Sequence, residues 1–405
     1  MVLVLFTAIS IFGFKAYKEI PVDAFPDITP KQVVIYTESP GNSAEDIEKL
    51  ITYPLESALS GMAGVKLIMS NSIFGLSYVS VFFDDSMDIY FLRQLVSERL
   101  AGVNIPAGWG KPVLGPNTTG LGQVFWYQIH DTTGKYSLQQ LKEMQKYIVT
   151  PLLKSVSGVE EVVGWGGDEK QYNVLIDTKK LQNFDITYED IVKALQKSNQ
   201  VAGGQYLEFN REQYLIRGAG LYKNLDDIRD SVIKSAEGQA VTIRDVAKVE
   251  VGSAPRFGAV SKDAKEVVMG MVLQRTATNA AKVVALVKEK IPTVNSALPK
   301  GVEIETIYDR TDLRHKVVEL MTEALVSGTV LVIIVLFLFL FELRSAFVVV
   351  ISLPLSLLIA FLLMDYYNIS ANLMSLSGLA IAVGMIVDGA VVVVENSFRK
   401  LHHNP

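Results

Sequence analysis

Cysteine is absent from this chain of 405 residues, and histidine occurs only four times. Without thiols there is no disulfide scaffold, thiolate metal centre or cysteine nucleophile. The four histidines, at positions 130, 315, 402 and 403, are too scattered or too terminal for their spacing to predict a metal centre. An excess of positive charge is also missing, since 38 basic residues face 43 acidic ones. The composition therefore gives no electrostatic reason to expect nucleic-acid binding.

Familiar enzyme motifs are missing as well. The sequence has no G-x-S-x-G nucleophile motif, no H-E-x-x-H zinc motif and no G-x-x-x-x-G-K-[ST] phosphate-binding loop. We therefore expect neither an enzyme nor a resident cofactor.

Charge is almost absent from one long segment near the end of the chain. The 71 residues from Ala324 to Val394 include only four charged ones: Glu342, Arg344, Asp365 and Asp388. An α-helix needs roughly 20 apolar residues to cross the hydrocarbon core of a membrane. Three runs have about that length: Ala324–Phe341, Ala346–Met364 and Leu373–Val394. The sequence therefore predicts three membrane spans.

The N-terminal residues 1–14 are also uncharged. We interpret them as part of a further spanning helix whose first turns precede this sequence, with a signal peptide as the alternative. The basic residues Arg344, Arg399 and Lys400 all flank the spans on one side. Positive charge favours the cytoplasmic side, so residues 15–323 are predicted to lie in the periplasm of a Gram-negative cell.

This extramembrane region alternates short β-like runs with amphipathic helices. Strands are predicted at Val33–Tyr36, Val65–Met69 and Tyr78–Phe83, and a helix at Asp88–Leu100. Another helix is predicted to begin at a Ser43 cap. Its apolar stripe is predicted to face a sheet and comprises Ile47, Leu50, Ile51, Leu55 and Leu59.

A weak internal repeat indicates duplication. Pro54–Gly61 is echoed by Pro151–Gly158, and Ile105–Gly108 by Leu298–Gly301. The echoes predict two βαββαβ units at about 23–115 and 116–311. The second unit is interrupted by an insertion at about 162–253.

One charged residue lies inside the third apolar run. A carboxylate at a helix centre costs at least ~2.5–3.5 kcal/mol to insert, and such residues usually mark ion or proton pathways. Asp388 is therefore predicted to relay protons, and Glu395, seven residues on, is a weaker second candidate. A purely structural hydrogen bond between helices is the alternative. Gly378 and Ala382 have the spacing that lets another helix approach closely.

Two methionines are candidate soft ligands. Met269 and Met271 lie on one face of a predicted strand and could offer sulfur to Cu(I). Core packing is the preferred role for both.

The segment around Asp388 strongly resembles the fourth transmembrane helix of the resistance-nodulation-division (RND) efflux transporters. That segment is Gly384-Met-Ile-Val-Asp388-Gly-Ala-Val-Val-Val-Val-Glu395-Asn396. Four further motifs resemble the heavy-metal efflux branch: Ile20-Pro-Val-Asp-Ala-Phe-Pro-Asp-Ile, Gly115-Pro-Asn-Thr-Thr-Gly-Leu-Gly, Tyr308-Asp-Arg and Asn372-Leu-Met-Ser-Leu-Ser-Gly-Leu-Ala-Ile-Ala-Val-Gly. Gly389 stands where the multidrug branch typically has a second aspartate.

The resemblance implies a homotrimeric inner-membrane pump, driven by proton influx, that exports metal cations. It also implies a periplasmic adaptor and an outer-membrane channel as partners, and the proton-relay role for Asp388. The implied fold is a membrane α-helical bundle of about four spans plus a periplasmic α+β region. The implied divisions are a truncated first transmembrane helix (1–17), porter subdomain 1 (18–115), porter subdomain 2 (116–161 and 254–311), a docking subdomain (162–253) and transmembrane helices two to four (312–405).

The transported metal stays open between a copper/silver and a zinc/cobalt/nickel type, with a slight preference for divalent ions. Met374 and Met385 are the candidates for a methionine path. By resemblance, the substrate-binding methionines and the lysine partner of the relay belong to a second half that this sequence does not contain. Two other functions remain open: a multidrug RND pump, and a membrane-anchored periplasmic receptor that transports nothing.

Overall fold

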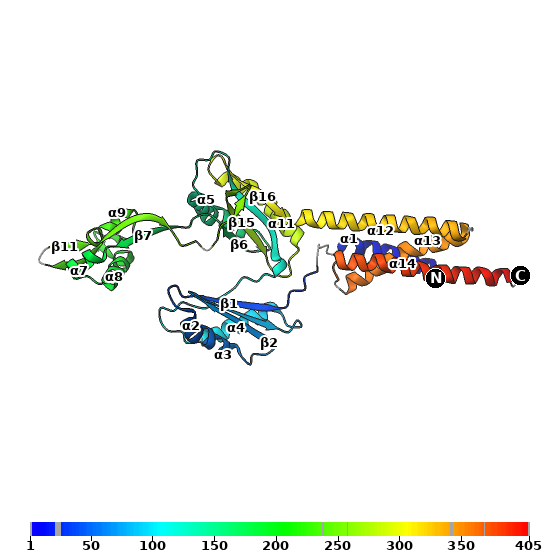
Figure 1. The fold of residues 1–405 in the computed structure, drawn as a ribbon, viewed down its shortest axis with the longest axis horizontal. Helices are drawn as coiled ribbons and strands as arrows, with labels where there is room; N and C mark the ends of the chain where they lie inside the picture. The colour runs from blue at the N-terminus through cyan, green and yellow to red at the C-terminus, as the bar shows by residue number, and fades with distance from the viewer. Residues whose placement is uncertain are drawn as a thin grey trace.

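The computed structural model describes residues 2–20, 26–236, 239–256, 258–340, 343–367 and 369–403. The molecule is elongated (Figure 1). A group of long helices lies at one end, two sheets with their own helices lie in the middle, and an inserted α+β unit lies at the other end. The architecture is thus α+β, as expected.

The first sheet has the strand order β2-β3-β1-β4, with antiparallel pairing throughout. Two helical segments pack on one of its faces around a dry core that includes Val33, Val81 and Leu92. The elements follow each other as βαββαβ. Their bounds are β1 Gln32–Glu38, α2 Ala44–Ile47, the π turn η1 Glu48–Thr52, α3 Tyr53–Leu59, β2 Val65–Ile73, β3 Leu76–Phe83, α4 Ile89–Ala101 and β4 Val113–Leu114.

The predicted strands and helix starts in this unit are confirmed. The Ser43 hydroxyl accepts a hydrogen bond from the Asp46 N–H (3.2 Å), and the Asp88 carboxylate caps α4. The predicted apolar stripe is wrong at one position, because Leu50 is 36% exposed whereas Thr52 is buried. The π turn η1 lengthens the helical period here, so every fourth residue is buried: Ile47, Ile51, Leu55 and Leu59.

The second sheet repeats this plan. Its strand order is β16-β5-β15-β6. If the strands of each unit are numbered one to four along the chain, both sheets have the order 4-1-3-2. Its bounds are η2 Gly120–Gly122, β5 Gln123–Asp131, α5 Leu138–Met144, the π turn η3 Gln145–Val149, α6 Thr150–Lys154, β6 Val159–Trp165, β15 Val268–Gln274, α11 Ala280–Ala297 and β16 Val302–Asp309.

The sequence echoes correspond to equivalent places in the two units. Pro54 and Pro151 are each the second residue of a helix that directly follows a π turn. Gly61 and Gly158 both lie in the turn between that helix and the next strand with positive φ, +76° and +87°, a conformation that glycine adopts without steric cost. The repeat is therefore one of structure as well as of sequence.

An inserted unit lies between β6 and β15 and has its own small core around Ile191, Ile243 and Val249. Strands β7 and β12 pair along seven residues and join it to the second sheet. The bounds are β7 Lys170–Ile176, α7 Thr178–Phe184, α8 Tyr188–Ser198, β8 Gln200–Phe209, β9 Glu212–Gly220, α9 Leu225–Arg229, β10 Val232–Ala236, β11 Gln239–Thr242, α10 Ile243–Val246 and β12 Ala247–Ser253, followed by a short hairpin of β13 Ser261–Lys262 and β14 Lys265–Glu266.

Four long helices form the remaining end of the molecule: α1 Val2–Glu19, α12 Arg310–Leu340, α13 Leu343–Tyr366 and α14 Leu373–His403. They cover the predicted apolar runs, although many side chains of α12 and α13 lie outside the described part of the structure. Within the part that is described, no helix contains an apolar stretch long enough to span a bilayer.

Helices α1 and α13 approach each other closely at Gly13. A Cβ atom added to Gly13 would lie 2.7 Å from both Cβ and the carbonyl oxygen of Leu358. The spacing of Gly378 permits a close approach, but no described atom lies within 4 Å of a Cβ placed there. Glycine therefore permits close packing at α1 rather than at α14.

Candidate functional site

The beginning of α14 is fixed by a buried polar cap. Asn372 is only 4% exposed. Its Oδ1 accepts hydrogen bonds from the backbone N–H groups of Met374 (3.0 Å) and Ser375 (3.1 Å), and its own N–H donates to the Ser375 hydroxyl (2.9 Å). These contacts satisfy the free donors of the first helical turn and so set where α14 begins.

Asp388 lies 15 residues into this helix, and its side chain is exposed. Among the described side chains, no basic group forms an ion pair with it. Glu395 follows two helical turns later, about 10 Å along the axis at 1.5 Å per residue, and its side chain lies outside the described part. The helix thus aligns the two predicted relay residues on nearly the same face.

The structure does not bring Met374 to Asp388. Met374 is 68% exposed at the beginning of α14. Fourteen residues separate it from Asp388, which is about 21 Å of helix. The two residues therefore cannot share one ligand.

Candidate metal ligands are seldom grouped in the part of the chain that the structure describes. It contains no group of three or more His, Cys, Asp or Glu side chains that could hold a metal ion. Met269 and Met271 are 6% and 5% exposed and pair across β5 with Gln128 and Trp126. Both methionines are thus packed inside the molecule, consistent with the preferred packing role.

The motif Tyr308-Asp309-Arg310 forms a joint between the second sheet and α12. The Asp309 side chain is 1% exposed, pairs with Lys288 of α11, and accepts a hydrogen bond from the Thr311 N–H (2.7 Å). Arg310 donates to the Leu121 carbonyl oxygen. Because β16 ends at Asp309 and α12 begins at Arg310, strand and helix are continuous, and a buried carboxylate paired with a half-exposed lysine lies at their junction.

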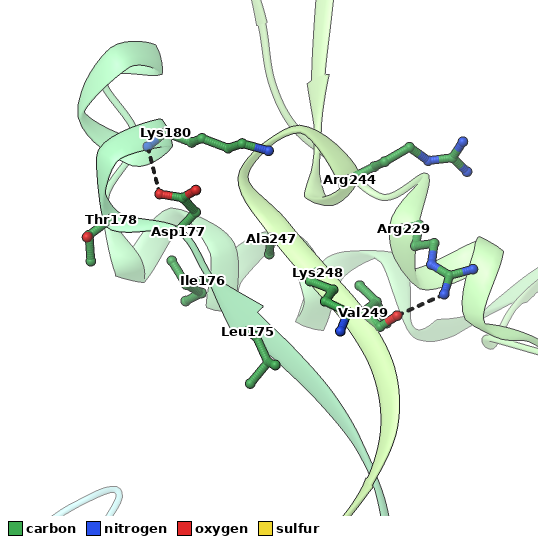
Figure 2. A pocket seen from close by; sticks show the side chains of 10 residues that line it. All are labelled: Leu175, Ile176, Asp177, Thr178, Lys180, Arg229, Arg244, Ala247, Lys248 and Val249. Carbon is green, nitrogen blue, oxygen red and sulfur yellow. Dashed lines mark hydrogen bonds between the residues drawn. The ribbon is translucent and has the colours of Figure 1, made fainter.

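A basic pocket of about 740 Å³ lies on the inserted unit (Figure 2). Its basic lining residues are Lys180, Arg229, Arg244 and Lys248, and its only acidic one is Asp177.

The two arginines of this basic pocket are already held in place. Arg229 donates to the Val249 carbonyl oxygen (2.8 Å) and pairs with Asp226, while Arg244 pairs with Asp230 (2.6 Å). These contacts fix the positions of the two guanidinium groups and offset their charge with carboxylates of the same unit.

The fold combines two βαββαβ units, an insertion in the second unit and an acidic residue inside a long helix. This combination is the one that the resemblance to RND efflux transporters implies, and a family model confirms the class. The AcrB/AcrD/AcrF family model matches residues 1–405, and the chain belongs to this family. The resemblance to RND efflux transporters is thereby confirmed.

The particular relatives are heavy-metal cation efflux proteins. The chain is 40% identical over 400 residues to the cation efflux system protein CzcA of Alcaligenes sp. (strain CT14), covering 96% of this chain and 37% of that protein. It is 40% identical over 405 residues to the cation efflux system protein CusA of Escherichia coli (strain K12), covering 98% and 39%. A crystal structure of a heavy metal efflux pump superposes with a TM-score of 0.84 at 35% identity, covering 98% of this chain and 40% of that one. The chain thus spans about two fifths of the length of these relatives.

Proposed function

We propose that this chain is the N-terminal part of a proton-driven transporter that exports heavy-metal cations. The observation that supports this most strongly is the position of Asp388, an acidic residue midway along α14 in a chain homologous to cation efflux proteins. An acid in an apolar helix is expected to exchange its proton when the surrounding helices change their packing. Its charge state would then depend on which conformation the protein adopts.

The topology that we propose follows the apolar runs. Helices α1, α12, α13 and α14 cross the inner membrane of a Gram-negative bacterium, and the α+β region lies in the periplasm. The two βαββαβ units act as porter subdomains 18–115 and 116–161 with 254–311, and 162–253 acts as the docking subdomain. The proposed assembly is a homotrimer.

The proposed partners are a periplasmic adaptor and an outer-membrane channel. The proposed docking position on the inserted unit is the basic pocket. Its two arginines and Lys248 are paired with carboxylates of this chain, so Lys180 is the cation that would meet an acidic partner surface. The substrates that we propose are divalent cations, since CzcA of Cupriavidus metallidurans is named a cobalt-zinc-cadmium resistance protein. The copper/silver type would instead require a path of sulfur ligands, and Met374 and Met385, its two candidates on α14, are not reinforced by other methionines there.

Substitution of Asp388 by asparagine in the complete gene tests the relay. Asparagine keeps the shape of the side chain but cannot exchange a proton, so we expect metal resistance to fall to the level of a deletion strain. Membrane insertion and trimer formation should be retained. The measurements are growth in graded zinc, cobalt and copper, and the size of the purified assembly.

Asp365→Asn is the matched control, because Asp365 is an exposed acid near the end of α13 and belongs to no proposed relay. This control should retain resistance. Unchanged metal resistance in Asp388→Asn would exclude the relay, and loss of drug tolerance alone would favour a multidrug pump. Full resistance without the gene would favour a receptor that transports nothing.

A further inference from the structure

One face of the second sheet lies opposite the helices of its core. Phe125, Tyr127 and Ile129 of β5 belong to the core beneath α5, α6 and α11. Side chains alternate along a strand, so Gln128 and His130 lie on the opposite face. The register places Glu305 directly across from Gln128, and Glu303 across from His130. A polar row therefore crosses β5 and β16 on the face opposite these helices.

Three of these side chains converge on one point. Gln128 Nε2 lies 2.5 Å from Glu305 Oε2 and 3.2 Å from His130 Nδ1. His130 Nδ1 and Glu305 Oε2 are 3.9 Å apart. An amide nitrogen only donates hydrogen bonds, so the lone pair of Nδ1 must face the amide. His130 therefore has its Nδ1 unprotonated, which is the form that a metal ion binds at this nitrogen.

Gln128 provides the observation that indicates a ligand. The residue is 3% exposed, and its Oε1 has no hydrogen-bond partner among the described residues. An unpaired buried carbonyl oxygen is costly and uncommon in folded proteins. Rotation of the amide by 180° would place Oε1 where Nε2 now lies, between His130 and Glu305. This rotation gives up the two hydrogen bonds of Nε2 and turns Oε1 towards the Glu305 carboxylate, so it occurs only when a cation lies between the three side chains and offsets that cost.

Glu305 has one carboxylate oxygen free to face His130. Lys262 donates to its Oε1 (2.7 Å), which leaves Oε2 facing His130 Nδ1. The side chains of His130 and Glu305 are 45% and 42% exposed, so the point between them is accessible from solvent.

We propose that His130 Nδ1, Glu305 Oε2 and the rotated Gln128 Oε1 form a binding site for one divalent cation of the Zn²⁺, Co²⁺ or Ni²⁺ type. Ligands about 2.1 Å from a tetrahedral zinc ion lie roughly 3.4 Å apart, close to the present 3.9 Å. One imidazole and two oxygen donors suit borderline metals, whereas Cu(I) prefers sulfur and Ca²⁺ prefers oxygen alone. Cation binding here stands on these contacts, and only its place on an export route rests on the proposed function.

The test is a titration of the purified 405-residue chain in detergent with Zn²⁺ by calorimetry and with Co²⁺ by absorption spectroscopy. All variants are made in a His402→Ala/His403→Ala background, because this histidine pair could itself bind metal. We expect one bound ion, with affinity reduced roughly tenfold or more by His130→Ala and by Glu305→Gln. His315→Ala is the matched control and should bind as tightly as the background chain.

Lys262→Gln provides a variant whose effect cannot come from misfolding. It removes a positive charge beside Glu305, so the affinity for Zn²⁺ should rise several-fold. Absence of binding in the background chain, equal affinity in His130→Ala and Glu305→Gln, or weaker binding in Lys262→Gln would each overturn the site.

The Asp388→Asn chain separates the two proposals. Its Zn²⁺ affinity should equal that of the background chain. Metal binding that depends on His130, combined with full resistance in Asp388→Asn cells, would refute the transport mechanism and leave the site intact. Metal binding that does not depend on His130, combined with loss of resistance in Asp388→Asn cells, would refute the site and leave the transport mechanism intact.

Discussion

At the scale of single residues, Asp131 shows how local hydrogen bonds set a charge state. One carboxylate oxygen accepts from the Thr133 hydroxyl (2.6 Å) and N–H (2.8 Å), and the other from the Tyr136 N–H (2.8 Å). These bonds, that of the Thr133 hydroxyl first, lower the pKa of Asp131 to about 2. The ionised form is therefore stabilised in the folded turn relative to the unfolded chain.

This shift predicts a stability difference with a defined pH window. Because the folded pKa lies below the unfolded value of about 3.9, the contribution of Asp131 is complete above that value and is lost as pH falls towards about 2. We expect Asp131→Asn to melt below the wild type at pH 5, with the gap closing between about pH 4 and 2. Melting temperatures measured across this range check the prediction. Thr133→Val removes the hydrogen bond that lowers the Asp131 pKa most, so the stability contribution of Asp131 should be lost at a higher pH in that variant. A difference in melting temperature between Asp131→Asn and wild type that does not depend on pH would contradict the prediction.

Residue-level prediction from the sequence succeeds where the signal is local. The cap at Ser43 lies three residues from the N–H group that it binds, so the pattern alone identifies it. Asp88 was predicted as the first residue of its helix and is instead the cap of that helix. The burial of Thr52 was missed, because a π turn shifts the helical period without any mark in composition. The contact of Gln128 with Glu305 was also missed, since 177 positions separate the two residues and only the strand register joins them.

At the scale of elements, the contact between α1 and α13 depends on the missing side chain of Gly13. A methyl group there would collide with the backbone and Cβ of Leu358, which cannot rotate away. We expect Gly13→Ala to destabilise the folded chain by about 1–3 kcal/mol through forced separation of the helices, less the gain from better helix propensity. Thermal unfolding of the purified chain in detergent measures the change.

Gly378→Ala is the matched control. Open space surrounds this position among the described residues, so only the helix-propensity gain of up to about 1 kcal/mol should remain. The two alanine substitutions are therefore expected to have opposite signs. A Gly13→Ala chain as stable as Gly378→Ala would show that the helices separate without cost.

At the element level, the sequence predicted the repeat but did not indicate the contact between α1 and α13. The echo of Pro54 in Pro151 marks equivalent helices because in each one the proline, which has no N–H to donate, closely follows a π turn. The spacing of Gly378 and Ala382 indicates only that close approach is possible, and it does not identify a partner. Gly13 gave no comparable signal, because it stands alone in an apolar run.

At the scale of the whole molecule, the inserted unit is attached by two segments, one between β6 and β7 and one between β12 and β13. We call these two polar segments the neck. Arg256 links two sides of this neck, since it pairs with Asp168 (3.3 Å) and with Glu266 of the β13–β14 hairpin. The Ala254 N–H also donates to the Glu169 carbonyl oxygen (2.8 Å). The orientation of the unit is thus held by a few charged and backbone contacts rather than by a dry core.

Removal of Arg256 should loosen this neck selectively. In Arg256→Met we expect amide hydrogen exchange at the neck ends of β7 and β12 to become roughly threefold to tenfold faster, with exchange in the first sheet unchanged. Hydrogen-exchange mass spectrometry of the whole chain resolves both regions. Lys154→Met, which breaks an ion pair with Glu161 at α6, is the control and should not affect the neck. Equal exchange in the two variants would contradict the role of Arg256.

The direct continuation of β16 into α12 has a mechanical consequence. A flexible linker would absorb a shift or rotation of the helix, but no residue separates Asp309 from Arg310. The Lys288 contact ties the same point to α11, and the Leu121 contact ties it to the segment that leads into β5. A tilt of the long helix therefore strains three neighbouring segments at once, and the sheet must turn with it as one stiff body.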